Sequence, residues 1–207
     1  VQWRFQSGAK ITFTHMFYEK EKYNFQGSQI PLLMFDELTH FSEAQFFYML
    51  SRNRSTCGVR PYVRATCNPD TDSWVADFIE WWINQETGYA IPERLGVLRY
   101  FYRIEGELIW GDSIKELSEK CKNVEGFSPD LCKSVTFIAS SVFDNEALLR
   151  IDPGYLANLH GLPLVEKERL LMGNWKIRPA AGLYFKHSQT RIVKEVPDKV
   201  EVVCRAW

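Results

Sequence analysis

Long hydrophobic runs are missing from this chain of 207 residues. The longest uninterrupted apolar runs, residues 32–35 and 46–50, are far shorter than the roughly 20 residues that a membrane-spanning helix needs. The amino terminus carries no apolar stretch of signal-peptide length behind a charged start. The first residue is Val1 rather than Met, so we expect the chain to begin inside a longer reading frame.

Metal-binding or disulfide motifs and an excess of charge are missing as well. The five cysteines form no Cys-x-x-Cys pair and the four histidines show no metal-ligand spacing. We therefore expect neither a disulfide framework nor a zinc site, and a reducing cytoplasm. The 25 basic and 26 acidic residues leave a net charge of -1, which excludes a histone-like protein that binds nucleic acid through its overall charge.

The sequence is instead rich in aromatic residues and alternates short apolar strands with amphipathic helices. Hydrophobic residues make up 45% of the chain and aromatic ones 14%, which argues against disorder and suffices for one good core. The alternation favours α/β architecture. We expect strands at residues 9–16, 30–35, 59–66, 134–139 and 200–207, a hairpin at 97–110, and helices at 42–51, 71–86, 112–121, 153–160 and 163–172.

Three of these elements carry expectations about burial. Apolar and polar residues alternate in strand 9–16, which predicts one buried face. Strand 30–35 is almost continuously apolar and should be covered on both faces. Helix 71–86 presents an aromatic stripe that should pack into the core. The stripe consists of Trp74, Phe78, Trp81 and Trp82, spaced i, i+4, i+7 and i+8.

Helix starts are marked by capping residues. Ser42 with Gln45 forms a capping box, and Asp112 is expected to cap the helix that follows it. Asp152 followed by Pro153 at the first helical position marks a further start.

Two adjacent carboxylates, Asp36 and Glu37, follow the apolar strand 30–35. Parallel α/β folds bind ligands at the carboxyl ends of their strands. Because neighbouring strand residues point in opposite directions, the two acids can hold different partners. In a nucleotidase, Asp36 would lie in the shell of Mg²⁺ and Glu37 would orient or deprotonate the attacking water. The alternative is a solvated strand end at which Asp36 initiates a turn.

The next expected strand also ends in polar residues, Thr66 and Asn68, and then breaks at Pro69. In P-loop ATPases of the additional-strand type, the strand after the acidic pair ends in a polar residue that senses the γ-phosphate. A hydroxyl or amide can hydrogen-bond a phosphate oxygen or the catalytic water. The alternative is an Asn-Pro turn in which Asn68 bonds its own backbone. Both motifs together, each at a strand end, favour the nucleotidase.

Six groups of residues resemble, in order along the chain, the ATPase of tailed-bacteriophage terminase large subunits. They are residues 23–29, 33–41, 52–55, 64–70, 143–145 with 152–156, and 169–175. The resemblance covers nearly the whole chain. It implies an α/β fold with an incomplete P-loop NTPase-type parallel sheet of the additional-strand class, a small helical lid subdomain and the first strand of a ribonuclease-H-like domain.

The resemblance also implies a role in the viral DNA-packaging motor. ATP hydrolysis, with ATP and Mg²⁺ as cofactors, would drive double-stranded DNA into the procapsid, and a mostly absent second domain would cut the DNA. Expected partners are double-stranded DNA, the portal protein, the small terminase subunit and further copies in a homo-oligomeric ring, without a membrane. The expected location is the host cytoplasm and, transiently, the portal vertex.

Specific residues match the motifs of that family. By resemblance, Asp36 is the Mg²⁺-associated acid and Glu37 is the catalytic carboxylate. The coupling motif, which links hydrolysis to movement, would be Thr66, Cys67, Asn68 and Pro69, with Thr66 and Asn68 also contacting the nucleotide.

Two arginines are candidates for one further role. Arg52 and Arg54 follow the first helix after the acids and could reach, as arginine fingers, a γ-phosphate on a neighbouring subunit. The alternative is that both are surface cations that cap the carboxyl end of that helix.

The chain departs from the family at both ends. No Gly-x-x-x-x-Gly-Lys-Ser/Thr occurs, so we expect the phosphate loop to lie before Val1. Residues 200–207 resemble the first nuclease strand, whose metal-binding aspartate follows the tryptophan. We therefore expect residues 1–177 to be the carboxyl-terminal part of the ATPase domain with a lid at about 140–177, then a linker at 178–199 and the truncated start of the nuclease domain at 200–207. The chain alone should be inactive.

Two other functions stay open. Asp36-Glu37 followed by Ala65-Thr66 is similar to the second and third helicase motifs, although His40 is misplaced for an Asp-Glu-x-His box and the lid-like segment has no helicase counterpart. A non-catalytic phage assembly module would instead bind the portal or DNA through its aromatic helix. An aromatic stripe of this kind is more often part of the core.

Overall fold

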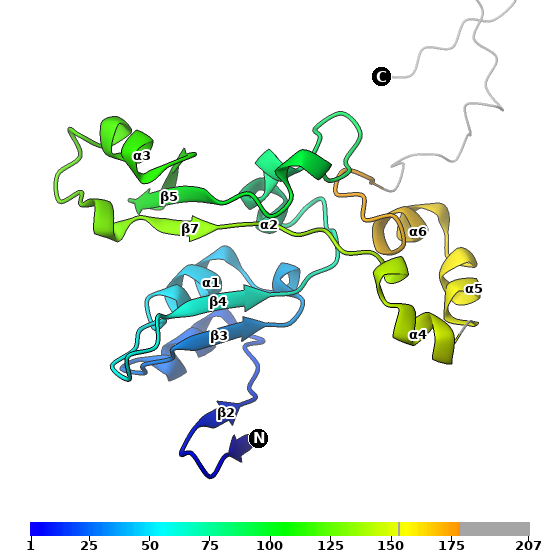
Figure 1. The fold of residues 1–207 in the computed structure, drawn as a ribbon, viewed down its shortest axis with the longest axis horizontal. Coiled ribbons are helices and arrows are strands. Elements are labelled where there is room, and N and C mark those ends of the chain that lie inside the picture. Colours follow the sequence, from blue (N-terminus) through cyan, green and yellow to red (C-terminus); the bar gives the residue numbers. More distant parts are fainter. Residues whose placement is uncertain (153, 179–207) are drawn as a thin grey trace, which may run out of the picture. The chain divides into compact units, whose positions relative to one another are not determined.

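The computed structural model describes residues 1–152 and 154–178 (Figure 1). The chain divides into two units, residues 1–177 and 178–207, and the elements below belong to the first. The strands are β1 (Gln2–Arg4), β2 (Lys10–Thr12), β3 (Leu32–Phe35), β4 (Tyr62–Ala65), β5 (Arg99–Ile104), β6 (Glu107–Gly111) and β7 (Lys133–Val135). The α-helices are α1 (Glu43–Leu50), α2 (Trp74–Phe78), α3 (Ile114–Lys120), α4 (Glu146–Ile151), α5 (Gly154–His160) and α6 (Leu164–Leu170). Among the described residues, none of these helices has the length and apolar character that crossing a membrane requires.

The strands of the described region form three small sheets. β1 pairs with β2 and β6-β5-β7 form a three-stranded sheet, both antiparallel, whereas β3 and β4 pair in parallel (Figure 1). The expectation of a mixed α/β fold with parallel pairing is therefore confirmed, and the parallel part consists of this one pair in the described residues. The two strands pair in continuous register, from Leu32 opposite Tyr62 to Phe35 opposite Ala65. The residues that follow Phe35 and Ala65 therefore lie at the same edge of the sheet.

The side chain of Asn53 contacts the backbone at the point where the two parallel strands begin. Its Nδ2 donates to the carbonyl oxygens of Ile30, Pro31 and Tyr62 at 2.9, 3.1 and 3.2 Å. The backbone continues the ladder, since the N–H of Tyr62 donates to the Pro31 carbonyl at 3.0 Å. One amide thus satisfies two carbonyls just before β3 and the carbonyl of the first residue of β4.

An aromatic core connects the parallel pair to the antiparallel sheet. The rings of Phe47 in α1, Phe78 in α2 and Phe101 in β5 contact one another with centroids 5.7 to 6.3 Å apart. Phe46 of α1 packs against Phe35 of β3 at 5.4 Å. Tilted and edge-on ring pairs stabilise a core beyond the area that they bury. This packing fixes the end of β3, and with it the acids that follow, against α1 and α2.

The predicted aromatic stripe is part of this core, but the predicted helix 71–86 is too long. Phe78 and Trp82 are buried, which confirms the interpretation of the stripe as core. The α-helix ends at Phe78, because Ile79 leaves helical geometry at φ -104° and ψ 9°, and a 3₁₀ turn over Glu80–Trp82 follows. Trp82 is buried from a 3₁₀ turn, in which side chains are spaced differently from those of an α-helix. The 3.6-residue period that predicted a continuous helix therefore does not extend to Trp82.

Two predictions about strand burial are wrong. The expected half-buried strand 9–16 is only β2, and its Ile11 is 46% exposed, because β2 pairs with β1 alone among the described residues. The expected two-sided burial of strand 30–35 holds for one face. Leu33 and Phe35 are buried there, whereas Met34 on the other face is 73% exposed. In the described part of the chain, helices and sheet cover β3 from one side.

Local turn and cap signals were predicted better. The capping box is present, with the Gln45 N–H donating to Ser42 Oγ at 3.1 Å and the Ser42 N–H donating to Gln45 Oε1 at 2.8 Å. The hairpin of β5 and β6 turns at Glu105 and Gly106, which have φ values of 50° and 94° as a type I′ turn demands.

Other boundaries differ from the prediction. Ser113, not Asp112, caps α3, because Asp112 accepts a hydrogen bond from Arg99 Nε at 2.8 Å instead. The strand predicted at 134–139 is the shorter β7. Helix α4 was not predicted, and its cap is Asn145, whose Oδ1 accepts from the Leu148 N–H at 3.0 Å.

Some predictions fall on residues that the structure does not describe. The helix start at Pro153 and the strand at 200–207 lie outside the described residues. So does the linker predicted at 178–199, apart from its first residue.

Candidate active site

The first acid, Asp36, lies directly opposite Thr66 at the carboxyl edge of the parallel pair. The hydroxyl of Thr66 donates to Asp36 Oδ1 at 2.8 Å. Backbone bonds extend the ladder past the strand ends, from the Thr66 N–H to the Phe35 carbonyl at 2.9 Å and from the Leu38 N–H to the Thr66 carbonyl at 2.8 Å. The parallel register of β3 and β4, continued by these backbone bonds, therefore brings the two side chains together.

The second acid, Glu37, adopts a conformation that is rare for a residue with a side chain. Its φ of 54° and ψ of 63° lie in the left-handed helical region. Its carboxylate is held from both oxygens by Asn68, whose Nδ2 donates to Oε1 at 2.7 Å and whose backbone N–H donates to Oε2 at 3.1 Å. Backbone strain that persists at a fixed, solvent-accessible carboxylate is typical of functional sites.

The structure thus brings together four of the predicted site residues. Asp36 and Glu37 hold different partners, as the alternation of strand side chains suggested. Asn68 donates its side-chain amide to Glu37, so the simple Asn-Pro turn does not describe what that amide does. Thr66 and Asn68, two residues apart on one strand end, each contact one acid. The roles assigned to these residues remain predictions.

The other two residues of the predicted coupling motif face the protein interior. Pro69 is buried, and Cys67 is packed against the hydrophobic core. Burial raises the pKa of the Cys67 thiol to about 11, and the Glu37 carboxylate acts in the same direction. The thiol is therefore neutral at physiological pH and serves packing rather than chemistry.

The cysteines allow a direct test of this placement. Cys57 is exposed, and its hydrogen bond with the Ser55 hydroxyl lowers the pKa of its thiol. At pH 8, iodoacetamide should alkylate Cys57 roughly a hundredfold faster than Cys67, because the thiolate is the reactive form. Peptide mass spectrometry over time measures both rates, and denaturant should abolish the difference. Equal rates in the native protein would show that Cys67 is not packed as described.

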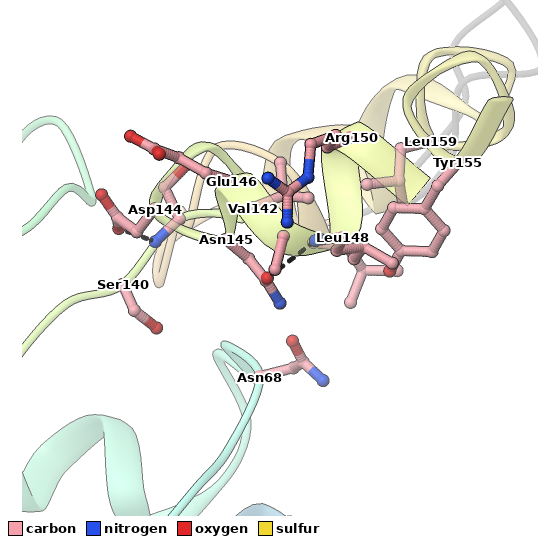
Figure 2. A pocket seen from close by; sticks show the side chains of 13 residues that line it. Asn68, Ser140, Val142, Asp144, Asn145, Glu146, Leu148, Arg150, Tyr155 and Leu159 are labelled. Atoms are coloured by element: carbon pink, nitrogen blue, oxygen red, sulfur yellow. Dashed lines mark hydrogen bonds between the residues drawn. The ribbon is translucent and has the colours of Figure 1, made fainter. Parts of the chain in front are cut away.

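Two hollows adjoin this edge, and Asn68 lines both. The larger is an open cavity of about 1080 Å³ between Asn68 and the helical segment, a size typical of ligand sites (Figure 2). Figure 2 shows Asn68 facing Asn145 across it, with Arg150 and Tyr155 farther along the helices. The smaller measures about 180 Å³ and lies beside Glu37. Its lining residues are Glu37, Thr39, His40, Asn68, Pro69, Asp70, Arg169 and Leu170.

The candidate finger residues Arg52 and Arg54 lie at the opposite edge of the parallel pair. The carbonyl of Arg52 accepts from the Ile30 N–H, before β3 begins, and its guanidinium stacks 5.2 Å from the Tyr48 ring centroid. Arg54 donates to the carbonyls of Gly27 and Ser28, at 3.3 Å each, rather than to the end of α1. Neither arginine reaches the acids of its own chain, so a finger role would require a neighbouring subunit.

The residues at this edge suit Mg²⁺ with a nucleotide better than a protein-enclosed metal. In the described part of the chain, no group of three or more His, Cys, Asp or Glu side chains is placed to hold a metal ion. Mg²⁺ commonly takes one or two carboxylates and completes its shell with substrate phosphates and water. Asp36 offers one such carboxylate, and the Thr66 hydroxyl lies beside it as a further oxygen atom.

The sequence motifs indicated the four residues at this edge but no role for Asn53 or Arg169. Arg169 lies in a segment that resembles the known family, and that was its only signal. Asn53 likewise lies in the resembling segment 52–55, but its role depends on three carbonyls that only the fold brings together.

Comparison with known proteins identifies the family. Residues 1–192 match the family model described as the terminase large subunit, T4likevirus-type, N-terminal. No curated protein and no solved structure matched the chain. The family match covers well over half of the sequence, in agreement with the resemblance noted from its motifs. The chain therefore belongs to the T4-like virus type of terminase large subunits and represents their N-terminal region, the ATPase region of a phage DNA-packaging protein.

Proposed function

We propose that Asp36 and Glu37 are the hydrolytic carboxylates of an ATPase that drives double-stranded DNA into a procapsid. The observation that carries this proposal is the pairing at the carboxyl edge, where Thr66 holds Asp36 and Asn68 holds Glu37. Each acid has a fixed position and its own partner, as division of labour between a metal ligand and a base requires.

In this proposal, Asp36 would hold the Mg²⁺ that arrives with the nucleotide. Its Oδ1 accepts from Thr66, which leaves Oδ2 for the ion or a water bound to it. Glu37 orients the attacking water and accepts its proton. ATP, when bound, would supply the electrophilic phosphate, and Mg²⁺ would supply the positive charge that neutralises the leaving group.

The contact between Glu37 and Asn68 links hydrolysis to the rest of the chain. Asn68 lines the cavity that faces α4, α5 and α6, which we assign to the lid subdomain at about 140–177. When Glu37 engages the water and its proton, its hydrogen bonds with Asn68 must change. A change in these hydrogen bonds would move Asn68 at the end of β4, and with it the wall of the cavity that faces the helical segment. A coupling motif links hydrolysis to movement in this way.

The assembled motor requires parts beyond these residues. We assign the Arg52 and Arg54 finger role to contact with a neighbouring copy in a homo-oligomeric ring, because both lie away from the acids of their own chain. The proposed partners are double-stranded DNA, the portal protein and the small terminase subunit. The proposed site of action is the portal vertex, and DNA cleavage would belong to the nuclease domain of the full-length protein.

Replacing Asp36 by Asn tests the metal role. Asn keeps an oxygen that can accept from the Thr66 hydroxyl, so the local fold should survive. The Mg²⁺ concentration for half-maximal ATP hydrolysis by the full-length protein should rise about 10- to 100-fold. Asp130→Asn, an exposed change outside the parallel pair, is the matched control and should behave as wild type.

The outcome separates the proposal from its competitors. An unchanged Mg²⁺ dependence in Asp36→Asn would remove Asp36 from the metal site. Absence of any ATP hydrolysis by the wild-type full-length protein would favour a non-catalytic assembly module. ATP-dependent separation of a forked duplex would favour a helicase.

A further inference from the structure

Arg169, near the end of α6, contains a buried polar atom without a partner. Its Nε is shielded from solvent and forms no hydrogen bond, and it is the one such side-chain atom in the described part of the chain. Leaving a charged donor buried and unpaired is costly, so such groups in native proteins usually mark an absent ligand or a functional role.

None of the described acceptors around Arg169 forms a hydrogen bond with its guanidinium. Arg169 lines the hollow of about 180 Å³ together with Glu37, Asn68 and Asp70. Both carboxylate oxygens of Glu37 accept from Asn68. Asp70 Oδ1 accepts from the backbone N–H of Asp72 at 3.1 Å. Among the described residues, Arg169 also forms no salt bridge.

Contacts outside the hollow hold this part of the chain in place. Glu168 accepts a hydrogen bond from the Tyr89 hydroxyl at 2.5 Å. Tyr89 lies on the loop that follows the 3₁₀ turn Glu80–Trp82. A little farther on, the Trp175 N–H donates to the Gly88 carbonyl at 2.8 Å. Gly88 is packed so closely that a Cβ atom there would lie 2.2 Å from Asn174 Oδ1. Arg169 is thus presented to the hollow by a docked segment and not by a free helix end.

The chemistry of the hollow selects the partner of this guanidinium. Arg binds phosphate oxygens through a planar fork of donors, more strongly than it binds neutral groups. Glu37, Asp70 and Arg169 together leave the hollow with one net negative charge, so a bare anion would not be attracted to it. A phosphate that arrives with its own Mg²⁺ avoids this repulsion. The larger cavity, which shares Asn68 and Leu170 with the hollow, has room for the remainder of a nucleotide.

We propose that Arg169 binds the terminal phosphate of an Mg²⁺-bound nucleoside triphosphate beside Glu37, and so joins α6 to the reacting end of the nucleotide. This inference rests on the function proposed above and deepens it, because it names the group on the helical segment that contacts the substrate. Loss of the terminal phosphate after hydrolysis removes the partner of Arg169. The contact between α6 and the acids is then present with the triphosphate and absent with the diphosphate.

The test measures nucleotide binding by the full-length protein with calorimetry. The probes are Mg²⁺ with a non-hydrolysable ATP analogue and Mg²⁺ with ADP. Arg169→Gln should weaken binding of the triphosphate analogue about tenfold or more and change ADP binding less than about twofold, because only the triphosphate carries the phosphate that Arg169 contacts. Arg169→Lys, which keeps the charge but loses the fork, should recover part of the loss.

Lys167→Gln is the matched control, because it removes the same charge from the same helix without lining the hollow. It should bind both probes as wild type does. An equal loss for both nucleotides, or no loss, in Arg169→Gln would overturn the assignment. If that variant fails to fold, Arg169→Lys decides, and wild-type triphosphate preference in it would overturn the need for the fork.

These outcomes are distinct from a failure of the proposed function. A wild-type protein that hydrolyses ATP in a Glu37-dependent way while Arg169→Gln keeps its triphosphate preference would refute this inference alone. A wild-type protein that does not bind Mg²⁺-ATP would refute both.

Discussion

Replacing Glu37 by Gln should reduce ATP turnover by the full-length protein about a hundredfold or more and leave Mg²⁺-ATP binding nearly unchanged. The amide has the size of the carboxylate but cannot accept a proton from the attacking water. One of the two contacts with Asn68 survives, because the Gln oxygen can still accept from Nδ2 as Oε1 does in the native chain. The side chain at position 37 therefore keeps its position beside Asn68 but can no longer act as the base.

Single-turnover hydrolysis and calorimetric binding of Mg²⁺-ATP separate these two effects. Glu107→Gln provides the control, since Glu107 is an exposed carboxylate on β6. A variant that loses binding and turnover in parallel would make Glu37 a binding residue and not a base. Turnover at the wild-type rate would exclude Glu37 from catalysis altogether.

The position of the site could be predicted because it follows from sheet topology. Parallel strands end at the same edge, so polar residues after each strand had to meet there if 30–35 and 59–66 were neighbours. Their pairing from Leu32 to Phe35 against Tyr62 to Ala65 confirms that premise. The detailed geometry could not be predicted. The left-handed backbone of Glu37 is uncommon for a residue with a side chain and is stabilised by Asn68, which lies thirty-one positions away.

The fold shows the same division between local and tertiary information. Ser42 with Gln45 and the turn at Glu105-Gly106 were predicted correctly, because each signal is complete within four residues. The length of α2 was not, because it depends on how Trp82 packs. Arg169 illustrates the limit most clearly. Its sequence context shows a charged residue near a helix end, and only the fold shows that its Nε is buried without a partner.

The packing of Trp82 in the aromatic core is important for the stability of the fold. Its side chain is fully buried, and its ring contacts those of Trp81 at 5.2 Å and Trp110 at 6.3 Å. Its Nε1 donates to the Val97 carbonyl at 3.2 Å, which ties the turn after α2 to the approach to β5. Removal of the ring would leave a large cavity in the core and one fewer hydrogen bond to the Val97 carbonyl, which would still accept from the Thr136 hydroxyl at 3.0 Å.

Trp82→Ala should therefore lower the free energy of unfolding by about 3 to 5 kcal/mol. Urea denaturation of the 207-residue chain, followed by circular dichroism, measures this change. Trp3→Ala is the matched control, since Trp3 is 62% exposed on β1 and its loss should cost less than about 0.5 kcal/mol. Equal destabilisation by the two variants would mean that Trp82 does not join the sheets. A large difference would show that the core around Trp82 stabilises the fold. Phe101 and Trp110 of the β6-β5-β7 sheet pack on Phe78 in this core. The same core supports the end of β3, where the two acids follow.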